Sequence, residues 1–305
     1  MICGATILWG ANNIFQVILD EPAGTEAQAR IKGKVLTGND AEHNPLAPGD
    51  RVSVQVHPDG AHILERHDRR NRVYRWNGKR QKQQTLAANV DQVVVVSSVS
   101  RPAAKPRFID RVLAMAELES IPAIVVVNKI DLGQTDTAYI SILRALAYPV
   151  FETSVVKRTG LVALTEALRK KTTVLIGQSG VGKSSLINAV FPSADQKTGT
   201  VSDRFDRGRH TTTTARRILV GDGMILIDTP GVREFDLYSY ETTEIAAGFR
   251  EFRPLIPDCR MPSCSHTHEP GCAVTEALRA GKIEERRYDS YLRIIEEIDG
   301  MEARS

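Results

Sequence analysis

Residues 177–184 read Gly-Gln-Ser-Gly-Val-Gly-Lys-Ser and fit the phosphate-binding pattern G-x-x-x-x-G-K-[ST]. The apolar stretch before them, Thr173 to Ile176, predicts a strand, and the stretch after them, Ser184 to Val190, predicts a helix. Glycines at these positions let backbone N–H groups surround phosphate oxygens at the positive end of the helix dipole. The sequence therefore predicts a P-loop that holds the phosphates of a nucleotide.

The P-loop residues have distinct expected roles. Lys183 is expected to neutralise the β and γ phosphates, which also makes it a candidate catalytic residue, and the Ser184 hydroxyl is expected to ligate Mg²⁺. The whole set expected at the nucleotide is Gly177, Gln178, Ser179, Gly180, Val181, Gly182, Lys183, Ser184 and Ser185.

The choice of base is predicted by a second motif, Asn128-Lys129-Ile130-Asp131, which follows the apolar stretch Ile124 to Val127. It resembles the NKxD motif with which translation-factor-type GTPases recognise guanine. Asp131 would accept hydrogen bonds from guanine N1–H and the exocyclic amine, which adenine does not present. Asn128 would reach the other edge of the base, and the stem of Lys129 would lie over the ring.

Thr153-Ser154 follows the next predicted strand, at the place where this kind of GTPase sets a backbone N–H against guanine O6. Helix capping alone would also explain the pair, because Thr and Ser are frequent caps.

Two further motifs are expected at the γ-phosphate. Asp228-Thr229-Pro230-Gly231 resembles the D-x-x-G motif, in which Asp228 holds a water on Mg²⁺ and the Gly231 N–H contacts the phosphate. Upstream lies the run Gly-Arg-His-Thr-Thr-Thr at 208–213, from which one threonine is expected to complete the Mg²⁺ shell. Thr212 is the preferred ligand, and Thr211 is the alternative.

The residue after D-x-x-G is Val232, where Ras-type enzymes carry a glutamine that orients the attacking water. Because valine forms no hydrogen bond with water, we expect slow intrinsic hydrolysis and a substitute from elsewhere. His210 is the candidate catalytic residue, and an exposed loop histidine without a role is the alternative.

The motifs run along the chain in the order NKID, TS, P-loop, HTTT and DTPG. Around them, apolar strands at 92–96, 123–127, 150–151 and 173–176 alternate with helices at 107–119, 138–147 and 161–171, and strands at 215–220 and 224–227 follow. Alternating strands and helices predict an α/β fold with a parallel sheet. One nucleotide must meet all five motifs, so the domain is predicted to be a circularly permuted P-loop GTPase domain.

The first ninety residues predict a small antiparallel barrel or sandwich, with short strands at 15–19, 29–36, 51–56 and 62–66 separated by turn signals. Residues 61 to 90 carry eight basic side chains against two acidic ones. With Tyr74 and Trp76 in the same stretch, this composition indicates contact with RNA phosphates and some base stacking. A solvated charged loop is the alternative.

A metal site is predicted near the end of the chain, where Cys259, Cys264, His266 and Cys272 form C-x4-C-x-H-x5-C. Three thiolates and one imidazole complete a tetrahedron, as in a structural zinc site. His268 is near enough in the sequence to compete with His266, but we expect it to be an exposed neighbour. Clustered cysteines also favour a reducing compartment over a disulfide framework, and we expect a cytoplasmic protein.

The overall composition of the sequence argues against other classes of protein. No run of 18 apolar residues predicts a membrane span, and the first residues show no basic leader followed by a long apolar stretch. We expect no membrane partner and a monomer. The net charge of +3 is small, so an RNA-binding surface requires the local concentration of charge described above.

The permuted order, the strings GRHTTT and DTPGVREF and the Cys-rich tail resemble the small-subunit-dependent ribosomal GTPases, the RsgA or YjeQ family. The resemblance covers nearly the whole chain. It implies an N-terminal OB-fold β-barrel at 1–88, the permuted GTPase domain at 89–240 and a C-terminal helical zinc-binding domain at 241–305. It also implies one zinc ion at the same four positions, Mg²⁺ with GTP or GDP, and 16S rRNA of the 30S subunit as partner, with the subunit stimulating hydrolysis during its late maturation.

Two other functions compete with this one. A GTP-dependent RNA-binding factor with incidental hydrolysis agrees with Val232. A P-loop ATPase or small-molecule kinase is disfavoured by Asp131.

Overall fold

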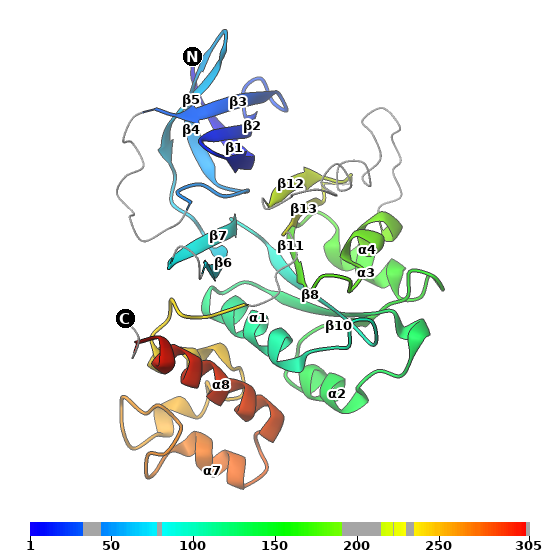
Figure 1. The fold of residues 1–305 in the computed structure, drawn as a ribbon, viewed down its shortest axis with the longest axis vertical. Helices are drawn as coiled ribbons and strands as arrows, with labels where there is room; N and C mark the ends of the chain where they lie inside the picture. The colour runs from blue at the N-terminus through cyan, green and yellow to red at the C-terminus, as the bar shows by residue number, and fades with distance from the viewer. Residues whose placement is uncertain (33–43, 78–80, 191–214, 222, 230–234, 303–305) are drawn as a thin grey trace.

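The computed structural model describes residues 1–32, 44–77, 81–190, 215–221, 223–229 and 235–302. Figure 1 shows a β-barrel at one end, a mixed sheet with helices on both faces in the middle, and a helical C-terminal part at the other end. None of the helices in these ranges is both long and apolar enough to cross a lipid bilayer.

The N-terminal strands close into a barrel, in the order β1-β2-β3-β5-β4. The prediction of a barrel is confirmed, but not that of a wholly antiparallel one, because β3 and β5 pair in parallel. Its core consists of side chains that alternate along the strands, among them Ile7, Val17, Val52 and Ile63, none of which is exposed. The strands are β1 (Ile2–Ala11), β2 (Ile14–Leu19), β3 (Glu26–Ile31), β4 (Arg51–His57) and β5 (Gly60–Arg66).

Strand β1 was not among the predicted strands. It joins β2 through Asn12 and Asn13, whose φ angles of 49° and 62° are those of a two-residue hairpin turn. Two consecutive asparagines between apolar stretches are the local signal that could have located this hairpin.

A separate two-stranded hairpin, β6 (Arg72–Asn77) and β7 (Lys82–Ala88), connects the barrel to the central sheet. The basic stretch of the sequence is therefore partly regular structure and is not one charged loop.

The central sheet has the strand order β10-β9-β8-β11-β13-β12. Five strands are parallel, as predicted, whereas β12 runs antiparallel to β13 because a short turn joins the two. The strands are β8 (Gln92–Ser98), β9 (Ala123–Asn128), β10 (Val150–Glu152), β11 (Thr172–Gly177), β12 (Arg216–Leu219) and β13 (Ile225–Asp228).

Helices cover both faces of this sheet (Figure 1). Val93 and Val95 of β8 pack with α1 and α2, whereas Val94 and Val96 pack with α3 and α4, because successive strand residues point to opposite faces. The helices are α1 (Pro106–Leu118), α2 (Thr137–Ala145), α3 (Leu161–Leu168) and α4 (Lys183–Val190), with a short turn η1 (Ile130–Leu132).

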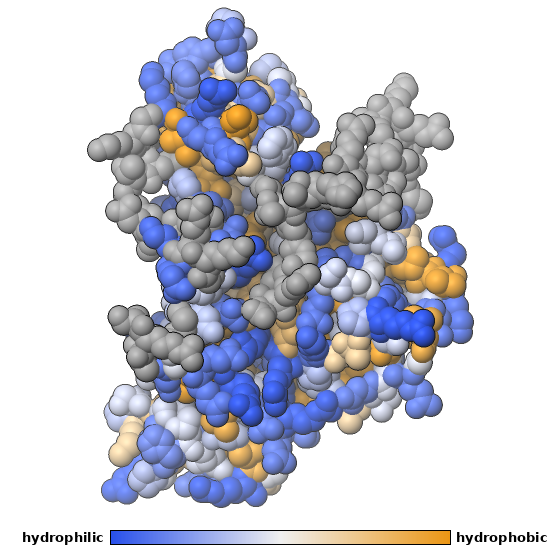
Figure 2. Space-filling view, in the orientation of Figure 1, coloured by the Kyte–Doolittle hydropathy of each residue, from blue (hydrophilic) through white to orange (hydrophobic). Residues whose placement is uncertain are grey.

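The C-terminal part shares the hydrophobic core on the α1 side of the sheet. Phe249, Phe252, Tyr291 and Ile294 belong to the same buried cluster as Val112 of α1. On the face drawn in Figure 2, hydrophilic side chains predominate over α1 and α8. The elements are α6 (Thr242–Ile245), η3 (Ala246–Gly248), η4 (Ile256–Asp258), α7 (Ala273–Arg279) and α8 (Glu285–Glu302).

A buried ionic network fastens α8 to α1 and α2. The Arg287 guanidinium lies 2.5 Å from Asp110 and 2.7 Å from Glu251, and the hydroxyls of Tyr139 and Ser290 donate to Asp110. Burial opposes the charge of Arg287, but the two carboxylates outweigh it and raise its pKa. The C-terminal part is therefore tied to the sheet by charge as well as by apolar packing.

Candidate nucleotide site and metal centre

Four of the five predicted nucleotide motifs follow strands of the central sheet. The P-loop follows β11, NKID follows β9, Thr153-Ser154 follows β10, and Asp228-Thr229 ends β13. Because these strands are parallel, their carboxyl ends meet at one edge of the sheet, where α/β proteins bind ligands. The structure thus brings the two halves of the predicted site together, although 46 positions separate Asp131 from Gly177.

The P-loop and the NKID motif touch directly. The Asn128 side-chain amide donates a hydrogen bond of 3.0 Å to the Val181 carbonyl. Gly182 has a φ of +94°, and a Cβ there would lie 2.5 Å from Asn128 Nδ2. Only glycine allows the loop to approach the asparagine this closely.

Lys183 and Asp228 face the phosphate end of the site. The Lys183 ammonium donates to the carbonyls of Gly177 and Gln178 at 2.7 and 3.1 Å. Burial lowers the pKa of Lys183 and raises the pKa of Asp228, and each charge partly offsets the shift of the other. Such a pair suits a site that receives phosphate and a cation.

The position of the chain after β13 is set by Thr229. Its hydroxyl, which is fully buried, donates a hydrogen bond of 2.8 Å to the Leu175 carbonyl on β11.

Ser184 and Ser185 lie in the first turn of α4, next to Lys183.

At the end of the site predicted to bind the base, hydroxyl groups hold the side chains of the NKID motif. Ser154 Oγ donates to Asp131 at 2.5 Å, and Thr153 Oγ1 donates to Asn128 Oδ1 at 3.1 Å. The hydrogen bond from Ser154 is the main cause of the lowered pKa of Asp131. The carboxylate is thereby kept ionised and oriented.

The backbone amides of Thr153 and Ser154 are engaged elsewhere, since they donate to the carbonyls of Val127 and Thr159. The hydroxyls of these two residues hold the side chains of Asn128 and Asp131, and the expected amide contact with guanine stays a prediction.

Lys129 joins three loops of the site. Its ammonium donates to the carbonyls of Gly180 and Arg101, both at 2.6 Å, so its stem runs along the P-loop. Arg101 lies in the loop between β8 and α1, which the sequence reasoning did not include in the site. Its position directly after a buried strand, between two motif-bearing strands of the sheet, is the signal that could have found it.

Several predicted site residues lie outside the residues that the structure describes. They are His210, Thr211, Thr212, Gly231 and Val232.

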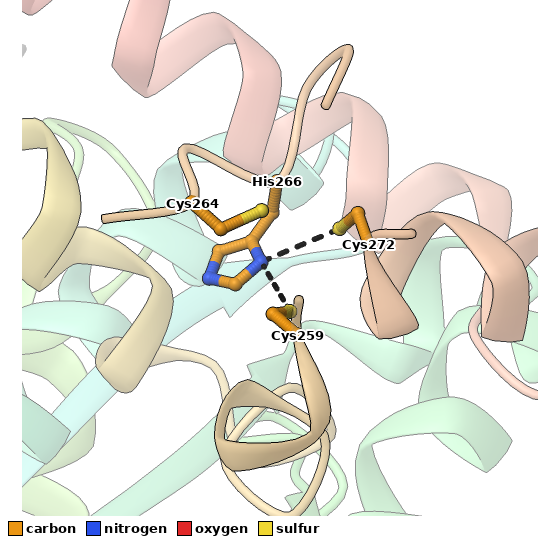
Figure 3. A group of neighbouring side chains, drawn as sticks. All are labelled: Cys259, Cys264, His266 and Cys272. Atoms are coloured by element: carbon orange, nitrogen blue, oxygen red, sulfur yellow. Dashed lines mark hydrogen bonds between the residues drawn. The ribbon is translucent and has the colours of Figure 1, made fainter. Parts of the chain in front are cut away.

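The predicted metal ligands converge, as Figure 3 shows. Cys259 follows η4, Cys272 caps the start of α7, and the ligand atoms of Cys259, Cys264, His266 and Cys272 all lie within 4.8 Å of one another. His266 Nδ1 is 3.4 Å from Cys259 Sγ and 3.5 Å from Cys272 Sγ. Tetrahedral zinc, with bonds of about 2.3 Å to sulfur and about 2.0 Å to nitrogen, separates such atoms by about 3.5 Å.

The surroundings decide between the two histidines. His266 is 2% exposed, and burial lowers its pKa, which favours the neutral imidazole that binds metals. His268 is exposed and contacts Thr267, so it is not part of the cluster. Burial raises the pKa of the Cys264 thiol to about 12. A bound cation would be needed to ionise that thiol.

Glu269 shapes the loop between these ligands. Its carboxylate accepts hydrogen bonds from the backbone amides of Ser265, Thr267 and His268, at 2.6, 3.1 and 3.2 Å. Burial opposes ionisation, but the hydrogen bonds outweigh it and lower the pKa of Glu269 to about 2.

The basic stretch predicted to contact RNA is largely paired within the chain. Arg69 forms an ion pair with Asp50, with 7% and 0% of the two side chains exposed. Tyr74 is 1% exposed and lies against Tyr240, so the expected stacking of an RNA base on Tyr74 is wrong. Other pairs in the stretch are Arg70 with Asp91 and Arg72 with Glu119.

Comparison with known proteins agrees with the fold and the motifs. A family model described as RsgA GTPase matches residues 66–238. The Small ribosomal subunit biogenesis GTPase RsgA of Borrelia recurrentis (strain A1) is 40% identical over 96% of this chain and 93% of its own. The protein of the same name from Gemmatimonas aurantiaca is 38% identical over 96% of this chain and 97% of its own.

Two solved structures are also similar. YjeQ from Thermotoga maritima superposes with a TM-score of 0.73 at 29% identity, covering 98% of this chain and 99% of that protein. YloQ, described as a circularly permuted GTPase, superposes with a TM-score of 0.72 at 28% identity, covering 99% of this chain and 96% of that protein. The chain therefore belongs to the RsgA family of circularly permuted GTPases, and it hydrolyses GTP.

Proposed function

We propose that this GTPase binds the small (30S) ribosomal subunit, assists its late maturation, and hydrolyses GTP faster when the subunit is bound. The observation that carries the proposal is full-length similarity to proteins named for small-subunit biogenesis, which spans the barrel, the sheet and the Cys-rich tail alike. The 16S rRNA would be the main partner, in the cytoplasm, with the protein acting as a monomer.

In the nucleotide site, Asp131, Asn128 and Lys129 would bind guanine, with Thr153 and Ser154 holding the first two side chains in place. Lys183 and the P-loop amides would bind the phosphates. When Mg²⁺ is bound, it neutralises phosphate charge; Ser184 and Thr212 would ligate it, with Asp228 on a bound water and the Gly231 N–H at the γ-phosphate.

We assign one structural zinc ion to Cys259, Cys264, His266 and Cys272, because their ligand atoms lie within 4.8 Å of one another and three thiols with one imidazole are a typical structural zinc set. The proposed division of the chain is a barrel part at 1–88, a GTPase part at 89–240 and a zinc-binding part at 241–305.

The test is GTP hydrolysis by the purified full chain, titrated with 30S and, separately, with 50S particles. The proposal expects strong stimulation by 30S and little by 50S. Binding to 30S without stimulation would instead favour a GTP-dependent RNA-binding factor, a function compatible with Val232 after the D-x-x-G motif.

His210 is the proposed group that orients the attacking water. His210→Ala should abolish most of the 30S-stimulated turnover while GTP affinity stays the same, because one such group contributes about 10²–10⁴-fold. His268→Ala, in an exposed position of the tail, is the matched control and should behave as the wild type. Unchanged stimulated turnover in His210→Ala would exclude this role.

A further inference from the structure

We infer that Arg101, Lys105 and Arg107, three exposed cations at the start of α1 and in the loop before it, form a contact surface for an RNA phosphate backbone. We call these three residues the basic lip; Lys105 among them lines a cleft beside the P-loop. The inference rests on the proposed function, since it names the part of the GTPase domain that would meet ribosomal RNA. Two observations support it: the three cations have no carboxylate partner in the described part of the chain, and the cleft that Lys105 lines is next to the P-loop.

The cleft has a volume of about 320 Å³ and lies where three parts of the chain meet. Lys105 and Phe108 line it at the start of α1, Gln178 of the P-loop lines it on the nucleotide side, and Glu297 of α8 lines it on the C-terminal side. A molecule bound at Lys105 is therefore next to the nucleotide-binding loop.

Both acidic groups of the cleft are paired with the same arginine. Arg111 forms ion pairs with Asp236 at 3.5 Å and with Glu297 at 2.5 Å. Lys105 forms no ion pair with either carboxylate, although the two cations and two carboxylates that line the cleft sum to zero charge. The excess of positive charge therefore lies beside the cleft, at Arg101 and Arg107.

The basic lip itself has no intramolecular partner among the residues whose positions are described. Arg101, Lys105 and Arg107 are exposed, and none of their side chains forms an ion pair or hydrogen bond within that part of the chain. No acidic residue occurs between positions 99 and 109. The lip therefore contrasts with the basic stretch around β6, where Arg69, Arg70 and Arg72 are each paired with a carboxylate.

The chemistry of the lip favours the phosphate backbone of a nucleic acid over its bases. The only aromatic residue between 99 and 109, Phe108, is buried, so the lip offers no platform on which a base could stack. Three flexible cations within seven residues match the closely spaced charges of an RNA strand, which binding neutralises with release of counterions.

The lip is also connected to the nucleotide site through the backbone. The Arg101 carbonyl accepts a hydrogen bond from Lys129, whose ammonium is also bonded to Gly180 of the P-loop. RNA bound to the lip would therefore restrict the motion of the loop before α1, and through Lys129 also that of the P-loop.

The test variant is Lys105→Glu with Arg107→Glu in the full chain, which leaves Arg101 and its contact with Lys129 unchanged. The control is Arg279→Glu with Lys282→Glu, two exposed cations of the C-terminal part that change the net charge equally. Both variants should keep wild-type GTP affinity and basal turnover, which also shows that they fold.

Binding to 30S particles is measured over a range of salt concentrations, together with stimulated turnover. The Lys105/Arg107 variant should bind about tenfold more weakly or worse at low salt, with a salt slope smaller by about 1 to 2, and should lose stimulation at limiting 30S. The control should match the wild type.

The outcomes separate the two proposals. If the wild type itself is not stimulated by 30S, the proposed function fails. If the wild type is stimulated and the Lys105/Arg107 variant binds 30S equally well, the inference about the lip is overturned. A variant that loses affinity for 30S but binds protein-free 16S rRNA like the wild type would place a ribosomal protein at the lip and overturn the RNA assignment.

Discussion

At the scale of single residues, the site is held by short polar contacts between motifs that lie far apart in the sequence. Ser154 holds Asp131, Thr153 holds Asn128, and Asn128 in turn bonds to the P-loop. The groups proposed to bind the base and the loop proposed to bind the phosphates are therefore positioned by one another.

Asp131→Asn is expected to change the preferred base from guanine to xanthine. The amide cannot accept both guanine donors, but it can donate to the additional carbonyl of xanthine, so GTP affinity should fall by at least about tenfold and XTP should be preferred. Competition binding with both nucleotides measures the change. Ser154→Ala is the matched control, because it removes the hydroxyl but keeps the carboxylate; it should weaken binding and retain guanine preference. Unaltered selectivity in Asp131→Asn would contradict the assignment of the base site.

Gly182→Ala tests the close approach of the P-loop to Asn128. The added Cβ has no room beside Asn128 Nδ2, and the φ of +94° disfavours any side chain by about 1 kcal/mol or more. We expect GTP binding to weaken strongly and the melting temperature to fall by only about 2–4 °C for each kcal/mol of strain. Gly133→Ala serves as the control, because no heavy atom lies within 4 Å of the added Cβ there. Equal GTP affinity in the two variants would argue against the contact.

At the scale of elements, α8 is the helix that attaches the C-terminal part to the sheet. Its buried face carries apolar side chains together with Arg287, whose partners Asp110 and Glu251 come from different parts of the chain. Removing one member of such a buried network leaves uncompensated charge in the core.

Arg287→Ala is therefore expected to lower the free energy of unfolding by about 3–5 kcal/mol. Arg293→Ala on the same helix is the control; Arg293 pairs with Glu296 at the surface, and its loss should cost about 0.5 kcal/mol or less. Urea denaturation of both variants measures the difference. Similar losses of stability would mean that the buried network contributes little.

The zinc loop is the second element with a clear test. Cys264→Ser should lose the metal, because only three of the four ligands remain, while Cys3→Ser in the barrel should retain one zinc ion per chain. Metal content after gel filtration reports the stoichiometry. The loop is also held by Tyr288 and Tyr291 of α8, whose hydroxyls donate to the carbonyls of His266 and Ser265. Global unfolding is thus not expected on metal loss. A Cys264→Ser variant with a full zinc content would refute the ligand assignment.

At the scale of the whole molecule, the sequence predicted the permuted sheet and the barrel because both rest on local patterns. Alternating apolar stretches, glycine-rich loops and metal-ligand spacing are visible within a few residues of one another. Strand β1 was not predicted, although the two asparagines that join it to β2 are a local turn signal. The connection between β12 and β13 is likewise too short for a parallel pair, a local sign that the prediction of a parallel sheet did not use.

What could not be predicted depends on contacts between distant parts of the chain. Arg287 lies 177 positions from Asp110, and in the sequence it is one charged residue among several at the start of a helix. The pairing of Arg69 with Asp50 similarly removes a cation that composition assigned to RNA. Composition counts charges, but only the three-dimensional arrangement shows which of them are already neutralised.

The shared core on the α1 side of the sheet has a consequence for shortened forms of the protein. A polypeptide that stops near residue 240 would expose the apolar face of α1 that the C-terminal part covers, and Asp110 would lose its partner Arg287. Such a fragment would aggregate through its exposed apolar surface and would be readily degraded by proteases. A premature stop codon near position 240 should therefore have the same effect as loss of the entire protein.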